Sequence, residues 1–223
     1  MIQTDNILIR GASGTGKTYC ARAVAYYMCM NGDSVQDAFS QNIEADIEKI
    51  EEFISNSDQC EFIQIHPAMD YDDIVYGLKI NPSDGLQIEY AEKRVMKLCN
   101  LANGKDKKYC IIFDDIDRAD AGRLLGNVLY AMEYRNQPVD LSDGKVLIIP
   151  DNVILIFTEN STSLNGGLDL AVRRRMTYLN ELQSNRFELI KHYQGKINNN
   201  ALKLILDVYD RVSAFINSYA NVS

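Results

Sequence analysis

The chain has 223 residues, of which 46% are hydrophobic and 24% charged, and its formal net charge at pH 7 is −8. These fractions are near globular averages and exclude a wholly disordered chain, while the negative charge disfavours nonspecific DNA binding, which requires clustered Lys and Arg. The N-terminus lacks a signal-peptide pattern and no apolar run approaches the roughly 20 residues that span a bilayer, so we expect a cytoplasmic protein without membrane contact.

Residues 6–9 form a short apolar run that predicts a strand, and apolar residues at helical spacing follow from residue 20. Between them, residues 11–18 fit the phosphate-binding pattern GxxxxGK followed by Ser or Thr, in the strand, loop and helix context that this motif requires. Glycines let such a loop curl so that backbone N–H groups point at phosphate oxygens, and the helix N-terminus adds positive potential. We therefore expect a nucleoside triphosphate to contact Ala12, Ser13, Gly14, Thr15, Gly16, Lys17 and Thr18.

The next segments alternate between helical and strand patterns. Isoleucines over residues 43–54 recur at intervals of 4, 3 and 4 and predict an amphipathic helix. Residues 61–65 alternate as a strand does, and residues 81–85 have the composition of a turn. An apolar stripe over residues 95–102 predicts another helix.

Residues 109–113 are continuously apolar, as expected for a strand that is covered on both faces. A single helix is expected over residues 124–132, a β-hairpin around residues 143–144, and a second buried strand over residues 153–157. Because strands alternate with helices, the sequence predicts an α/β fold: a three-layer P-loop sandwich with a mainly parallel five-stranded sheet and β-hairpin insertions.

Beyond about residue 183 the strand patterns cease and only helical patterns remain. A chain of 223 residues is long enough for one sizeable core with a small appended unit. We therefore expect a nucleotide-binding core over residues 1–182 and a short, lid-like helical subdomain over residues 183–223.

A Mg²⁺ ion that accompanies a bound triphosphate needs oxygen ligands, for which the Thr18 hydroxyl and the Asp114 carboxylate are the candidates. Asp114 directly follows the strand over residues 109–113, and ligands of open α/β sheets bind at the C-terminal ends of the strands. Lys17 would neutralise the β- and γ-phosphates. Asp115 would orient or polarise the attacking water.

Two later segments supply further candidates. Asn160 follows the strand over residues 153–157 and could sense the γ-phosphate or position water, the alternative being an asparagine in a turn. Three consecutive arginines begin at Arg173, after a helical pattern over residues 168–172. Arg173 or Arg174 could reach across a subunit boundary to a neighbour's γ-phosphate as an arginine finger, the alternative being surface ion pairing.

These residues lie in segments that resemble the AAA+ domain of the McrB family, the nucleotide-driven motor subunit of modification-dependent restriction systems. The segments that carry the resemblance are residues 62–67 (FIQIHP), 71–78 (YDDIVYGL), 113–119 (FDDIDRA) and 168–176 (LDLAVRRRM). The corresponding family segments read FxQFHP, YEDFxxGL, IDEINRA and LDYALRRRF. The resemblance extends from about residue 6 to residue 180.

The resemblance implies an AAA+ nucleoside triphosphatase that binds and hydrolyses ATP or GTP with Mg²⁺. It also implies a homo-oligomeric ring with nucleotide at the subunit interfaces, acting as the motor or assembly module of an McrBC-like DNA restriction system. An McrC-like nuclease is the expected partner, and DNA contact would be indirect or made through another domain or subunit.

Two departures from the family pattern bear on the mechanism. Asp115 stands where the family has Glu, and because Asp is one methylene shorter we expect slow hydrolysis. Residues 159–163 replace the family segment MNxxDR, so that Asn160 matches but the Asp and the Arg do not. The choice between ATP and GTP and the coupling to an McrC-like partner are therefore left open.

Two other functions fit the same motifs. A nucleotide-binding oligomeric scaffold with little hydrolysis is consistent with the short Asp115 side chain. A P-loop kinase of small molecules is disfavoured, because such kinases clamp phosphate with a mobile basic lid. Here Arg173 and Arg174 instead follow the last predicted strand.

Overall fold

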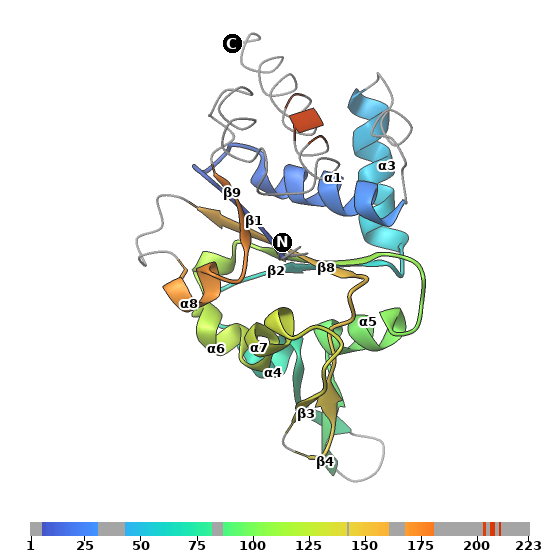
Figure 1. The fold of residues 1–223 in the computed structure, drawn as a ribbon, viewed down its shortest axis with the longest axis vertical. Helices are drawn as coiled ribbons and strands as arrows, with labels where there is room; N and C mark the ends of the chain where they lie inside the picture. The colour runs from blue at the N-terminus through green and yellow to red at the C-terminus, as the bar shows by residue number, and fades with distance from the viewer. Residues whose placement is uncertain are drawn as a thin grey trace.

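The computed structural model describes residues 6–30, 43–81, 87–141, 143–160 and 168–180, together with residues 203, 206, 207 and 210. Its centre is a five-stranded sheet with the strand order β2-β5-β8-β1-β9, in which every neighbouring pair is parallel (Figure 1). The strands are β1 (Asn6–Gly11), β2 (Cys60–Gln64), β5 (Tyr109–Asp114), β8 (Val153–Asn160) and β9 (Thr177–Asn180). The predicted five-stranded parallel sheet is therefore confirmed.

Helices cover both faces of this sheet, and Figure 1 shows the resulting three layers. One face carries α1 (Lys17–Cys29) and α3 (Ile43–Asn56), and the other carries α5 (Arg94–Ala102), α6 (Ala121–Leu125) and α7 (Asn127–Glu133). Side chains of β5 alternate between the two hydrophobic clusters: Ile112 packs with α1, whereas Ile111 and Phe113 pack with α5, α6 and α7. Because both faces are covered, the strand is apolar throughout, as its sequence predicted.

The prediction of a single helix over residues 124–132 is wrong, because the helical conformation is interrupted at Gly126, between α6 and α7. Gly126 has a φ of 48°, and a Cβ added to it would lie 2.8 Å from the ring of Tyr71. The apolar spacing continues across the break, since Leu124 and Val128 are both buried in the same cluster. Periodicity alone therefore does not reveal the break.

Two antiparallel strand pairs stand apart from the central sheet. The hairpin predicted at residues 143–144 is confirmed, because β6 (Val139–Asp140) pairs with β7 (Val146–Leu147). The second pair, β3 (Tyr76–Asn81) and β4 (Gln87–Glu92), projects from the body in Figure 1 and follows the short helix α4 (Tyr71–Ile74). For this second pair the sequence indicated only a turn.

The helical subdomain predicted over residues 183–223 lies almost wholly outside the described residues. Residues 203, 206, 207 and 210 are helical, and Leu206 is buried in the cluster that contains α1. The division at residue 182 therefore stays a prediction. Within the ranges that the structure describes, no helix combines the length and the apolar character that crossing a bilayer requires.

Candidate functional site

The loop between β1 and α1 is closed by bonds among its own residues. Gly14 and Gly16 have φ values of 79° and 83°, a left-handed conformation that residues with a Cβ rarely adopt. The Thr15 hydroxyl donates to the Ala12 carbonyl oxygen at 2.9 Å, across the mouth of the loop. No side chain caps α1 at Gly16, so the first N–H groups of the helix remain available to an anionic ligand.

Lys17, the first residue of α1, is 6% exposed. Its ammonium donates to the Ala12 carbonyl oxygen at 2.8 Å and to the Asn160 side-chain oxygen at 2.8 Å. Burial lowers the pKa of Lys17, and the carboxylates of Asp115, Asp117 and Asp114 act in the opposite direction. Because both hydrogen-bond acceptors are uncharged, a phosphate oxygen entering the loop would be a stronger partner for this ammonium.

Asp114 and Thr18 meet directly, although they come from different elements. The Thr18 hydroxyl on α1 donates to Asp114 Oδ1 at the end of β5, at 2.8 Å. The fully buried Thr158 on β8 donates to the same oxygen at 2.8 Å. A hydroxyl and a carboxylate oxygen in contact are the kinds of ligand that Mg²⁺ prefers. The pair therefore fits the predicted magnesium site.

Asp115 leaves β5 in a left-handed conformation, with φ of 57°. Its carboxylate accepts from the Asn160 side-chain nitrogen at 3.3 Å and forms an ion pair with Arg118 at 2.9 Å. Its backbone N–H donates to the Thr158 hydroxyl at 2.8 Å. Both carboxylate oxygens of Asp115 thus have partners within the chain.

Asn160 is the last residue of β8, so that strand is longer than predicted and the asparagine is not in a turn. Its side-chain oxygen accepts from Lys17 and its side-chain nitrogen donates to Asp115. Its backbone N–H donates to Asp117 Oδ1 at 3.2 Å. Asn160 therefore joins the phosphate-binding loop to the segment that follows β5.

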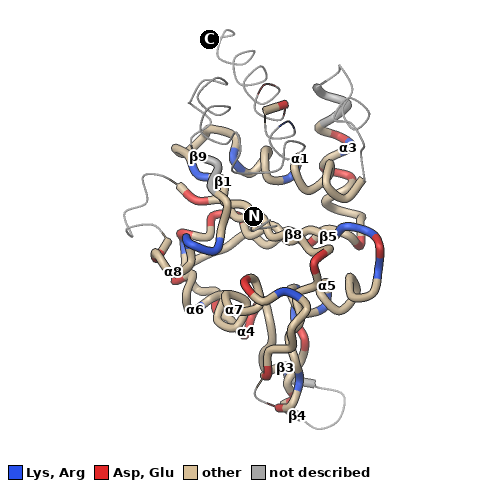
Figure 2. The backbone as a smooth tube through the Cα atoms, viewed as in Figure 1, with Lys and Arg blue, Asp and Glu red and all other residues tan. Residues whose placement is uncertain are grey.

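The three consecutive arginines lie around the end of α8 (Leu170–Arg173), where Figure 2 shows them as a basic stretch before β9. Arg173 donates to the fully buried Glu159 at 3.3 Å. Arg175 forms an ion pair with Glu133 at 2.9 Å. Arg174 is exposed, its backbone N–H donates to the Leu170 carbonyl oxygen at 3.1 Å, and its side chain has no hydrogen bond or ion pair with the described part of the chain. The structure does not bring Arg173 or Arg174 to the loop of its own chain.

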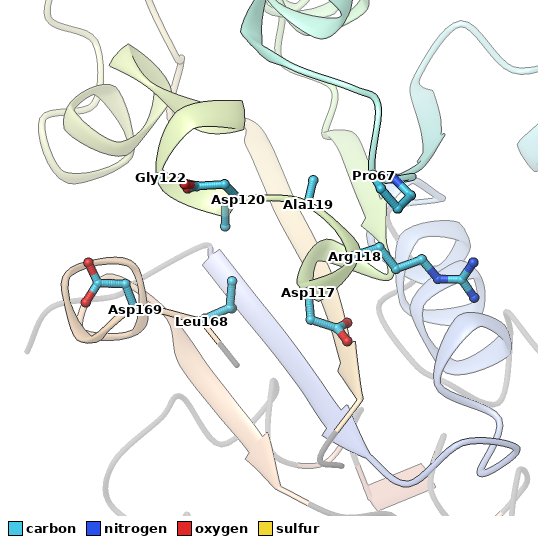
Figure 3. A pocket seen from close by; sticks show the side chains of 9 residues that line it. Pro67, Asp117, Arg118, Ala119, Asp120, Gly122, Leu168 and Asp169 are labelled. Atoms are coloured by element: carbon cyan, nitrogen blue, oxygen red, sulfur yellow. The ribbon is translucent and has the colours of Figure 1, made fainter. Parts of the chain in front are cut away.

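A pocket of about 380 Å³ borders the site at the same edge of the sheet. It lies between the segment that follows β2, the segment that follows β5 and the residues before α8. The residues that line it are Pro67, Asp117, Arg118, Ala119, Asp120, Ala121, Gly122, Leu168 and Asp169. Figure 3 shows Arg118 extending away from Leu168 and Asp169. Asp117 also accepts a hydrogen bond from the Asn160 backbone N–H, and Arg118 also forms an ion pair with Asp115. The pocket therefore adjoins the site without including the phosphate-binding loop.

Four residues with a place in this network were not predicted: Asp117, Arg118, Thr158 and Glu159. The available signal was position: Asp117 and Arg118 lie in the segment over residues 113–119 that resembles the McrB family, and Thr158 and Glu159 directly follow the apolar run over residues 153–157. That signal does not indicate which partners these side chains contact. The order of the strands decided the partners of Asp117 and Thr158, whereas Arg118 pairs with Asp115 three residues before it.

Comparison with known proteins identifies a family and individual similar proteins. The family described as the AAA domain, dynein-related subfamily, matches residues 46–176, which is more than half of the chain. The matched range includes Asp114 and Asn160, while the phosphate-binding loop lies before it.

The Type IV methyl-directed restriction enzyme EcoKMcrB subunit of Escherichia coli (strain K12) is 26% identical over 184 residues, covering 78% of this chain and 34% of that protein. The chain therefore spans about a third of that relative's length. A solved structure of a candidate ATPase from Cytophaga hutchinsonii ATCC 33406 has 16% sequence identity and a TM-score of 0.45, covering 93% of this chain and 53% of that one.

Proposed function

The chain belongs to the AAA domain family, dynein-related subfamily, with similarity to McrB, and from this membership we propose that it binds ATP or GTP with Mg²⁺ and hydrolyses it. The observation that carries the proposal is the contact between Thr18 and Asp114, together with that between Lys17 and Asn160. These contacts unite three separate segments at one edge of the sheet, directly beside a helix N-terminus whose N–H groups no side chain caps.

In this proposal the backbone N–H groups from Ala12 to Thr18 bind the phosphates, and Lys17 neutralises the β- and γ-phosphates. Thr18 and Asp114 hold Mg²⁺, which would neutralise charge on the same phosphates. Asn160, already within hydrogen-bonding distance of Lys17, would contact the γ-phosphate or the attacking water. The preformed network supports this division of roles, because the side chains that would contact the ligand already lie together.

Asp115 would orient the attacking water. Its carboxylate is held by Asn160 and Arg118, so its orientation is restricted, while its remaining lone pairs can accept a hydrogen bond from water. The shorter Asp side chain adds to this restraint. Slow hydrolysis follows from both features.

A homo-oligomeric ring with nucleotide at its interfaces would bring Arg174 of one copy to the γ-phosphate held by the next. Arg174 is the better candidate of the two predicted arginines, because Arg173 is engaged with Glu159 while Arg174 is exposed. Similarity to a restriction enzyme subunit supports a role as motor or assembly module of an McrBC-like DNA restriction system. An McrC-like nuclease would be its partner, and DNA contact would be made indirectly or through another domain or subunit.

A second candidate is a nucleotide-binding oligomeric scaffold with little hydrolysis. The specific observation in its favour is that both oxygens of the Asp115 carboxylate already have partners. The two candidates differ only in turnover, since both require nucleotide binding and assembly.

The test is titration of the protein with Mg-ATP and with Mg-GTP, followed by calorimetry, light scattering and phosphate release on the same samples. Binding with an increase in mass and steady phosphate release supports the triphosphatase. Binding and assembly without release supports the scaffold. Absence of binding heat with both nucleotides, on folded material, would exclude both candidates.

A further inference from the structure

Glu159 is a buried carboxylate to which the proposed function assigns no role. It lies on β8 immediately before Asn160 and is 0% exposed. Successive side chains of a strand point to opposite faces, so Asn160 faces the phosphate-binding loop while Glu159 faces away from it. The two residues nevertheless share one peptide unit at the end of the strand.

The contacts of Glu159 join three segments. Its Oε1 accepts from the Leu168 backbone N–H at 2.8 Å and from the Arg173 guanidinium at 3.3 Å. Its Oε2 lies 3.6 Å from Arg10 Nε, a separation too long for a hydrogen bond, and has no hydrogen-bond partner among the described residues. Burying a carboxylate is costly unless hydrogen-bond donors or cations accompany it, so the positions of Glu159 and Arg173 depend on each other.

The two arginines that flank Arg174 at the end of α8 are both held by other residues. Arg173 is held by Glu159, and Arg175 is held by Glu133 and by the Ala171 carbonyl oxygen. Arg174, between these two held residues, is exposed. These two contacts, together with the hydrogen bond from the Arg174 backbone N–H to the Leu170 carbonyl oxygen, hold the segment from which the Arg174 side chain extends.

We propose that Glu159 is the positioning residue that sets where each chain presents Arg174 to a neighbouring copy, and that it links this presentation to the chain's own nucleotide through Asn160. The inference rests on the proposed function, in which Arg174 acts on the neighbour's nucleotide. A γ-phosphate attracts the Lys17 ammonium more strongly than the neutral Asn160 oxygen does. Loss of that bond shifts the end of β8, and the shift reaches Arg173 through the Glu159 carboxylate.

The first test is Glu159→Gln, which keeps the side-chain shape and an oxygen for the Leu168 N–H but removes the charge that holds Arg173. We expect nucleotide affinity within about threefold of the unmodified chain, because Lys17, Thr18 and Asp114 are unchanged. We expect turnover to fall about tenfold or more, since an arginine acting in trans contributes a factor of about 10³–10⁵. The control is Glu48→Gln, which removes a carboxylate charge from an exposed position of α3. It should leave both nucleotide affinity and turnover unchanged.

Mixed oligomers separate an effect on the neighbour from an effect on the chain's own site. Lys17→Ala copies bind nucleotide too weakly to turn it over at working concentrations but present an intact Arg174, so mixing them with Glu159→Gln copies should restore turnover. Lys17→Ala copies should also restore turnover when they are mixed with Arg174→Ala copies. A mixture of Glu159→Gln with Arg174→Ala should stay inactive, because each site then receives a defective arginine.

The outcomes distinguish this inference from the function on which it rests. If Lys17→Ala copies rescue Arg174→Ala but not Glu159→Gln, Glu159 acts on its own site and the inference is wrong. If Arg174→Ala alone turns over at the unmodified rate, the trans role of Arg174 in the proposed function fails, and the inference fails with it. Should Glu159→Gln not fold, Arg173→Met breaks the same contact from the other side and must show the same rescue pattern.

Discussion

The Lys17 ammonium lies 2.8 Å from the side-chain oxygen of Asn160, a residue 143 positions later in the chain. The contact exists because β1 and β8 are neighbours in the sheet, with Gly11 and Asn160 in register. Lys17 follows β1 by one loop, and its side chain reaches back over that loop to the end of β8. The phosphate-binding loop and the candidate sensor are therefore parts of one hydrogen-bonded unit.

Lys17→Ala should weaken nucleotide binding about 100-fold, which corresponds to roughly 3 kcal/mol of charge-assisted hydrogen bonding. Calorimetric titration with Mg-ATP and Mg-GTP measures the change. Lys97→Ala removes the same charge from an exposed position of α5 and should bind as the unmodified chain does. Tight binding by the Lys17 variant would contradict the site assignment.

Asp115→Asn should lower turnover about 100-fold, because an amide cannot accept a proton from the attacking water. Asn tolerates the left-handed backbone at this position as well as Asp does. Phosphate release at saturating nucleotide is the measurement, with nucleotide affinity as the control. Turnover equal to that of the unmodified chain would remove Asp115 from the mechanism.

Asp115→Glu tests the effect of side-chain length separately. The longer carboxylate should reach water more easily and raise turnover several-fold. A longer side chain in the left-handed region should also reduce the free energy of unfolding by about 1 kcal/mol. Urea unfolding and phosphate release on the same preparation check both parts, and a drop in turnover with intact folding would show that length is not the restraint.

Thr158→Val should destabilise the protein by about 1–3 kcal/mol, because it leaves the Asp115 N–H buried without its acceptor. It should also raise the Mg²⁺ concentration needed for half-maximal turnover, since Asp114 loses the hydroxyl that orients it. Urea unfolding and Mg²⁺ titration measure the two effects. Thr158→Ser keeps the hydroxyl, and its Mg²⁺ requirement should stay close to that of the unmodified chain.

Gly14→Ala and Gly144→Ala form a matched pair. The two glycines have φ values of 79° and 80°, and a Cβ added to either would meet nothing within 4 Å. Each change should therefore lower the free energy of unfolding by a similar amount, about 1–2 kcal/mol, because alanine is strained in this left-handed conformation. Only Gly14→Ala should also weaken nucleotide binding, by about tenfold, because it alters the loop that surrounds the phosphates. Equal binding by the two variants would argue against phosphate contact at Gly14.

Much of the fold follows from local sequence patterns. The continuous apolar run at residues 109–113 and the turn at residues 143–144 each predicted the element that is present. The predictions failed where tertiary contacts decide. The helix expected over residues 124–132 is interrupted at Gly126, where the backbone passes close to the Tyr71 ring, and no residue near 126 in the sequence indicates that ring.

The phosphate-binding loop was determined by the sequence itself, because its bonds join residues no more than five positions apart, as between Ala12 and Lys17. The surroundings of that loop were decided only by the tertiary structure. Strand order places β8 beside β1 and β5 on the far side of β8, and this brings Asp114 to Thr18 and Asn160 to Lys17 across about 100 positions or more. Local patterns specify which residues form a strand, but the order of parallel strands depends on the packing of helices between them, which no short segment encodes.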